Sequence, residues 1–270
     1  MTRSTLGRLG TAAAALAMVC SGCNALQQFE EGGATVFVFA THHATPENGS
    51  FPGRGEDAMP RVFDNDEGWT VTLLEAYVTI SSVTLVACNG SERPLNMFWG
   101  PCPEDLKDQD LATLTVAGNR VGDGDYCSLR VTYAPYQTPV IDESADETRH
   151  ETPQNPAVSG STIYMRGGAQ LGDGEFTQFE LSSSETIVVD LDLSEIEGGS
   201  SFTVGHREDF PKELLVSKTY DRFFDAIDFS NFDPAMVEAD LADILAEETR
   251  ISLGTIVSME QNETPTMDGG

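Results

Sequence analysis

The feature that most constrains the fold of this chain is a succession of short strand-like runs separated by turn residues. The run Ala34–Ala40 is β-branched and aromatic without a polar interruption, and Trp69–Leu73 alternates, which is typical of strands. Gly172-Asp173-Gly174 lies between two such runs and predicts a hairpin. The expected strands, about nine, lie at 34–40, 69–73, 77–86 (one long bent strand or two), 127–133, 161–170, 176–181, 186–191 and 214–217. This spacing predicts a mainly β protein, an antiparallel β-sandwich or an open barrel, and we expect the sandwich.

A helical pattern follows the strands. Asp233 is a good N-cap residue and Pro234 suits the first helical position. The apolar residues that follow at helical spacing are Val237, Leu241, Ile244 and Leu245. We therefore expect one amphipathic helix over 233–248, within a single domain that spans 34–258. The polar segment 259–270 ends in paired glycines and predicts a disordered tail.

The densest aromatic segment, Tyr220–Phe229, comes shortly before this helix. Such a stripe is typical of core, and here it predicts the layer that seats the helix on the sheet. The alternative is an aromatic patch that binds a ligand.

The start of the chain has the pattern of an export signal. Arg3 and Arg8 are followed by the apolar run Thr11–Val19, which is too short to span a bilayer. The sequence then reads Ser-Gly-Cys23, which resembles the lipobox of bacterial lipoproteins, although Cys20 stands where that family usually has Leu. The resemblance implies that residues 1–22 are removed and that the Cys23 thiol carries a diacylglyceryl group. The alternative is an ordinary signal peptide with a chance cysteine.

A lipid on Cys23 would anchor the protein to a membrane of the cell envelope, with 23–33 as a flexible tether. Asn24, rather than Asp, follows the cysteine, which by analogy with enterobacterial sorting favours the outer membrane.

The chain beyond the leader is strongly acidic. Of its 15 basic residues two are in the leader, which leaves 13 against 44 acidic residues, a net charge of −31. Nucleic acid and anionic lipid surfaces would both be repelled, so we expect no nucleic-acid partner. Such a negative charge is typical of a solvated protein surface at high ionic strength. The alternative is a surface that concentrates divalent cations.

Three cysteines remain after the leader, at Cys88, Cys102 and Cys127. An exported protein can keep a disulfide. Cys88 ends one expected strand and Cys127 opens another, so we expect a Cys88–Cys127 bridge if those strands are neighbours. Cys88–Cys102 is the alternative, and a site of three thiolates comes third because no CxxC spacing occurs.

The histidines offer the main candidates for a metal site. Imidazole suits copper, zinc or nickel, and His42 and His43 are adjacent. Adjacent strand residues point to opposite faces, so both can bind one metal only where the chain has left strand geometry. The candidate ligands from other loops are Glu47, His150 and His206. The competing interpretation is a solvated or hydrogen-bonded histidine pair that binds no metal.

Catalytic motifs are absent from the sequence. It has no G-x-S-x-G, no H-E-x-x-H, no Walker loop and no G-x-G-x-x-G that opens a helix. We therefore expect a non-enzymatic module that binds a protein or small ligand, or has a structural role, and needs no cofactor. The alternatives are a copper- or zinc-binding protein and a hydrolase of unknown type.

Three segments of the chain carry a resemblance to known proteins: Trp69–Cys88, Gly124–Val131 and Phe223–Phe229. Together they resemble uncharacterised β-sandwich lipoproteins of myxobacterial type, which have a cysteine after a long strand, a G-x-Y-C strand start and a W-F-x-G-I-D-F-like segment. Phe223 stands for the Trp of that segment and Ala226 for its Gly. The layout is also similar to that of MbnP-type copper-binding periplasmic proteins. The resemblance implies the sandwich and the Cys88–Cys127 pairing, and it carries over no site residue.

Overall fold

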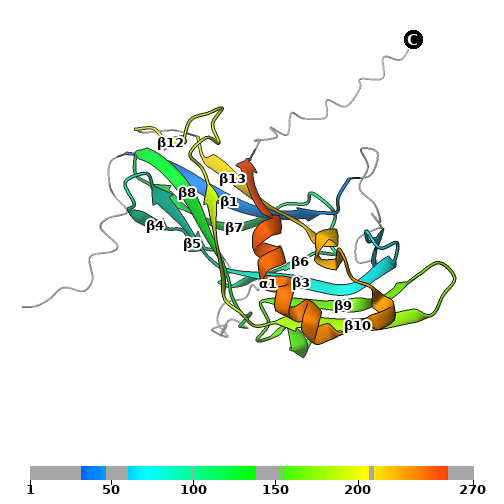
Figure 1. The fold of residues 1–270 in the computed structure, drawn as a ribbon. Coiled ribbons are helices and arrows are strands. Elements are labelled where there is room, and N and C mark those ends of the chain that lie inside the picture. The colour runs from blue at the N-terminus through cyan, green and yellow to red at the C-terminus, as the bar shows by residue number, and fades with distance from the viewer. Residues whose placement is uncertain are drawn as a thin grey trace, which may run out of the picture. The chain divides into compact units, whose positions relative to one another are not determined.

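The structure, a computed structural model, describes residues 32–46, 60–98, 100–137, 153, 155–206 and 210–254. These residues form two β-sheets and one α-helix (Figure 1). The expected sandwich is therefore confirmed. Cys23, the predicted signal peptide and the predicted tail lie outside the described residues. Within the described ranges, no helix is both long and apolar enough to cross a membrane.

The smaller sheet has five strands and contains the one parallel pair of the described residues. Its order is β14 (Thr249–Leu253), β13 (Lys212–Thr219), β1 (Ala34–His43), β7 (Leu114–Val121) and β5 (Asn96–Met97). β1 and β13 run parallel, with His42 paired to Lys218, and the described pairs elsewhere are antiparallel. Most of the chain separates these two strands, so no tight turn forces them to be antiparallel.

The larger sheet has nine strands built around β3 (Thr70–Ala87). Its main path is β10 (Phe176–Ser183), β9 (Ile163–Gln170), β3, β8 (Gly124–Tyr133) and β11 (Ile187–Asp192). The short strands beside this path are β2 (Arg61–Asp64), β4 (Glu92–Pro94) and β6 (Cys102–Asp105), which pair with β3, and β12 (Phe202–Val204), which pairs with β8. β3 thus joins the two expected runs at 69–73 and 77–86 into a single strand.

Two irregularities in β3 keep its apolar side chains on one face. Buried apolar residues fall on odd positions up to Leu73, on even positions from Ala76 to Ile80, and again on odd positions from Val83. Both changes of parity coincide with register shifts, at Leu73/Glu75 against β9 and at Ile80/Ser82 against β8. A bulge adds one residue to a strand, so it returns the next apolar side chain to the core.

The helix α1 (Pro234–Glu248) confirms the predicted helix. The Asp233 side chain accepts a hydrogen bond from the backbone N–H of Ala235 at 3.1 Å, and Pro234 occupies the first turn. Leu241 and Leu245 are fully buried. The helix packs on β10 of the larger sheet and on β13 of the smaller one, so it covers an end of the core where the two sheets diverge (Figure 1).

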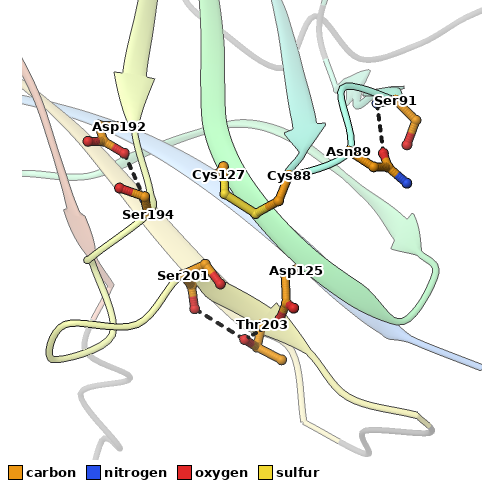
Figure 2. The surroundings of a disulfide bond; sticks show 9 residues. All are labelled: Cys88, Asn89, Ser91, Asp125, Cys127, Asp192, Ser194, Ser201 and Thr203. Atoms are coloured by element: carbon orange, nitrogen blue, oxygen red, sulfur yellow. Dashed lines mark hydrogen bonds between the residues drawn. A yellow bond between two sulfur atoms is a disulfide. The ribbon is translucent and has the colours of Figure 1, made fainter.

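A disulfide joins Cys88 and Cys127, as predicted (Figure 2). Cys88 directly follows β3, and Cys127 lies in the neighbouring strand β8. The Cα atoms are 4.8 Å apart, within the usual range for a disulfide. Cys102 is a buried free thiol. Burial, first, and the charge of Glu104 raise the pKa of this thiol to about 12, so it stays protonated.

Candidate functional site

A pocket of about 300 Å³ opens between α1 and the segment that precedes it. We call it the α1 pocket. That segment contains the 3₁₀ turns η4 (Tyr220–Phe224) and η5 (Phe229–Asn231). The apolar lining is Phe223, Ala226, Ile227, Phe232, Met236, Val237 and Ile244. Met236 is 71% exposed, so apolar surface reaches the mouth of the pocket. Part of the aromatic segment thus lines a cavity, while Phe224 and Phe229 lie in the core.

Four aspartates and one asparagine supply the polar lining of the pocket: Asp225, Asp228, Asn231, Asp233 and Asp240. Asp225 pairs with Arg222 at 2.8 Å, and Asp233 caps α1. Ser230 and Asn231 donate hydrogen bonds to Asp228, and these bonds lower the pKa of its carboxyl, which is therefore ionised at neutral pH. Asp240 has no hydrogen bond or ion pair within the described part of the chain. The lining thus combines an apolar surface with negative charge.

Asn65 fixes the segment that forms the pocket. Its side-chain amide donates to the carbonyls of Phe224 and Ile227, both at 3.0 Å, and its side-chain oxygen accepts from the backbone N–H of Trp69 at 2.8 Å. Ala226, between those two carbonyls, has a φ of +58°, a conformation that glycine adopts more easily. Its backbone N–H donates to Asp66 at 2.6 Å. The turn between β2 and β3 therefore holds this backbone in place.

The strand β1 determines the directions in which the side chains of His42 and His43 point. β1 continues through His43, so His42 and His43 point to opposite faces. His42 is buried, and its Nδ1 and Nε2 lie 3.0 Å from Glu104 Oε1 and from the backbone oxygen of Asp108. His43 Nδ1 is 2.9 Å from the backbone oxygen of Ala44. Both ring nitrogens of His42 are occupied, so it has none to offer a metal.

The structure does not bring His206 and His42 together. His206 lies at the other end of β1, where its ring is 3.6 Å from Asp123 and approaches Gly32. Ten residues of strand at about 3.3 Å each separate Gly32 from His42, a distance of roughly 30 Å. Glu47 and His150 lie outside the described residues. In the described part, no three His, Cys, Asp or Glu residues are grouped to hold a metal ion.

His42 belongs instead to a buried ion cluster, which we define as His42, Glu104 and Lys218. His42 and Lys218 are paired neighbours on β1 and β13, and Glu104 faces them from β6 of the other sheet. Glu104 Oε1 lies 3.0 Å from His42 Nδ1, and Glu104 Oε2 lies 2.6 Å from Lys218 Nζ. The ring of Tyr133 lies on the ammonium, with its centroid 6.0 Å from Nζ. Two positive groups thus share one carboxylate between the sheets.

Burial and charge act in opposite directions on the pKa values of the cluster. Burial by itself would lower the pKa values of His42 and Lys218 and raise that of Glu104. The attraction between the opposite charges, together with the His42–Glu104 hydrogen bond, outweighs burial, so the pKa values of His42 and Lys218 are raised and that of Glu104 is lowered. The cluster is held together by mutual attraction in a site that water does not reach.

Sequence reasoning missed Glu104 and Lys218, although one signal for Lys218 was present. Leu214 and Val216 point inward, and Lys218 continues the same period of two. A lysine that follows two inward-facing apolar residues at this spacing indicates that its charge is buried in the core. Glu104 carries no such signal because β6 is only four residues long and follows a proline-rich segment.

The comparisons with known proteins give a structural similarity but no sequence match. No family model and no curated protein matches the sequence. Among solved structures, MbnP from Methylosinus trichosporium is similar, with a TM-score of 0.40 and 10% identity over 83% of this chain and 99% of that chain. This is a distant similarity of layout, in keeping with the layout resemblance drawn from the sequence, and it extends to no site residue.

Proposed function

We propose that this protein is a non-enzymatic binding module whose ligand, an organic cation with an apolar body, occupies the α1 pocket. The observation that carries the proposal is the combination of apolar lining and acidic side chains in one cavity of about 300 Å³. Pockets that bind small molecules are mostly apolar with a few placed polar groups. Here the charged polar groups of the lining are all negative, so they favour a positive ligand and repel an anionic one.

Asp240 is the carboxylate best suited to meet the cation. Asp225 and Asp233 already accept from Arg222 and from the helix backbone, and Asp228 accepts from three donors. Asp240 lies on α1, one turn after Met236 and one turn before Ile244, so it stands between two apolar contacts. A ligand would therefore place its apolar body on these side chains and its charge beside Asp240.

The pocket favours binding over hydrolysis. Hydrolysis of a glycoside by paired carboxyls needs one of them held protonated as the general acid. Asp228 is held in the opposite state by its hydrogen bonds, and Asp225 and Asp233 have structural partners. The pocket lining also contains no Ser, His or Cys.

The test uses 2-phenylethylammonium as the probe and 2-phenylethanol as its neutral analogue, titrated by calorimetry at low salt. We expect the ammonium to bind more tightly than the alcohol. Asp240→Asn should weaken ammonium binding about two- to fivefold, as for an exposed ion pair, and leave the alcohol unchanged. Asp243→Asn is the matched control, because Asp243 lies on the same helix but outside the pocket lining. Absence of binding, or equal effects of the two variants, contradicts the proposal.

The proposed place of action is the cell envelope, through a lipid on Cys23. The support is the lipobox-like Ser-Gly-Cys23 after a short apolar run. A single acyl chain binds a membrane only marginally, so lasting attachment needs more than one chain. We expect the wild-type protein to sediment with membranes and to incorporate labelled palmitate, and Cys23→Ser to do neither. Equal labelling of both proteins would refute the anchor.

A further inference from the structure

The Lys218–Glu104 pair of the buried ion cluster has an unusual deficit of hydrogen bonds. The Lys218 side chain is 0% exposed and that of Glu104 is 4% exposed, with Nζ and Oε2 2.6 Å apart. Despite this approach, neither atom has an aligned hydrogen bond to any partner in the described residues. A buried ammonium and carboxylate are costly to desolvate, and only good geometry with further hydrogen bonds offsets that cost.

A second Lys–Glu pair, on the same strand, shows the ordinary arrangement. Lys212 Nζ lies 2.9 Å from Glu197 Oε1 and donates an aligned hydrogen bond to it. Both of these side chains are about a quarter exposed. Of these two Lys–Glu pairs, only Lys218 and Glu104 are in close contact without an aligned hydrogen bond.

His42 is placed to act on the other oxygen of Glu104. Its Nε2 faces a carbonyl, which only accepts, so Nε2 carries a proton. When Glu104 is a carboxylate it too only accepts, so Nδ1 also carries a proton and donates to Oε1. His42 is then an imidazolium that withdraws electron density from the Glu104 carboxyl group.

We propose that Lys218 and Glu104 join in an intramolecular amide bond, formed with loss of one water molecule and promoted by His42. The bond would link β13 of the smaller sheet to β6 of the larger sheet. It would replace two buried charges by one neutral amide, which removes most of the desolvation cost.

The reaction balances without an oxidant or any other reagent. A proton first moves from the Lys218 ammonium to Oε2, which gives a neutral amine and a carboxylic acid. The Nζ lone pair then forms the bond to Cδ, and the C=O electron pair moves to Oε1, where the Nδ1–H of His42 stabilises it. Finally Nζ passes a second proton to the Oε2 hydroxyl, the C–Oε2 bond breaks, water leaves, and the carbonyl re-forms at Oε1. Nζ keeps one hydrogen.

The fold supplies the conditions that this reaction needs. The resting pair is ionic because mutual attraction outweighs burial, but burial reduces the free-energy cost of the proton transfer that gives the neutral amine and acid. The two strands hold the amine against the carboxyl, which replaces a bimolecular encounter by a fixed approach. The same exclusion of water that makes the ion pair costly also protects the amide from hydrolysis.

The test is a peptide map of the full-length wild-type protein after disulfide reduction and trypsin digestion. Trypsin does not cleave after an acylated lysine, so we expect segment 213–222 uncut at Lys218 and joined to segment 62–107, which contains Glu104. The joined mass should be lower than the sum of the two by one water molecule. Recovery of 213–218 as a free peptide, with 62–107 unmodified, would overturn the proposal.

Two variants and one internal control sharpen the result. Lys218→Met should give the mass of the unlinked chain, and His42→Phe should form the link at least tenfold more slowly or not at all. Segments that contain Lys212 and Glu197 should remain unjoined in every sample. If either variant fails to fold, the wild-type peptide map still decides the question.

Discussion

At the scale of single residues, the most informative side chains are polar groups inside the protein. The Asn65 amide donates to the carbonyls of Phe224 and Ile227, which are distant in sequence, while its side-chain oxygen accepts from Trp69 in its own turn. Glu104 is shared between two cations. Neither role can be read from neighbouring residues in the sequence, because the partners come from other parts of the chain. Such groups define the position of one segment relative to another more sharply than apolar contacts do.

Asn65 should be essential to the α1 pocket. Asn65→Ala leaves two carbonyls and one N–H without their partners, so we expect the free energy of unfolding to fall by about 2 kcal/mol or more. Urea denaturation measures the change. Asn89→Ala, on an exposed turn, is the control and should cost less than about 0.5 kcal/mol. Equal losses in the two variants would mean that Asn65 does not hold the pocket segment.

Glu75 should give a pH-dependent contribution to stability. Partial burial acts to raise the pKa of Glu75, but hydrogen bonds from Asn155 (2.7 Å) and Arg166 (2.9 Å) outweigh it and lower the pKa below 4.5. A lowered folded-state pKa stabilises the fold above the unfolded pKa, and this stabilisation is lost as the pH falls through the folded pKa.

We therefore expect Glu75→Gln to destabilise the protein at about pH 6 by less than about 1 kcal/mol, and the difference from wild type to shrink toward about pH 3. Urea denaturation across this pH range is the measurement, with Glu67→Gln in an exposed turn as control. A difference that stays constant with pH would show that the carboxylate charge is not responsible.

At the scale of elements, the sequence predicts strands and the helix better than it predicts their partners. The runs at 34–40 and 127–133 and the hairpin at Gly172-Asp173-Gly174 are confirmed because periodicity and turn residues are local signals. β7 (Leu114–Val121) was missed because its Gly118 and Asn119 are residues that strands disfavour. Gly118 is needed there because a Cβ atom would lie 2.6 Å from the ring of Phe37.

Pairing and burial were harder to predict for a physical reason. Parallel pairing of β1 with β13 depends on the whole intervening chain, and no local pattern records it. The placement of His42 illustrates the consequence. Val38 and Ala40 share the inward face of His42, but the Glu104 partner of His42 comes from β6, far along the chain.

The disulfide is the element-scale contact whose contribution is easiest to measure. It links residues separated by 39 positions, for which chain entropy gives an upper estimate of about 4 kcal/mol. We expect the double variant Cys88→Ala/Cys127→Ala to be less stable by up to this amount. Reductant should destabilise the wild type to the same level and leave the double variant unchanged. An equal loss of stability in the wild type and the double variant on reduction would contradict the prediction, because the reductant would then act at another place than the Cys88–Cys127 bond.

At the scale of the whole molecule, the two sheets, the helix and the strong negative charge together support a module that receives a ligand. The helix covers one end of the core with Leu241 and Leu245 and presents Met236 and Asp240 to the α1 pocket. The same helix therefore contributes to the core and lines the α1 pocket. The charge of −29 on the full sequence adds a long-range attraction for cations, which salt screens.

The central claim, that the α1 pocket takes a cationic ligand, is tested most directly by the methyl NMR signals of methionine. Met236 lines the pocket, and Met165 on β9 is fully buried outside its lining, so one protein carries both probe and control. On titration with 2-phenylethylammonium we predict a saturable shift of the Met236 methyl signal, no shift at Met165, and a higher midpoint in Asp240→Asn. A Met236 signal that does not move, or that moves only in step with Met165, would contradict the account.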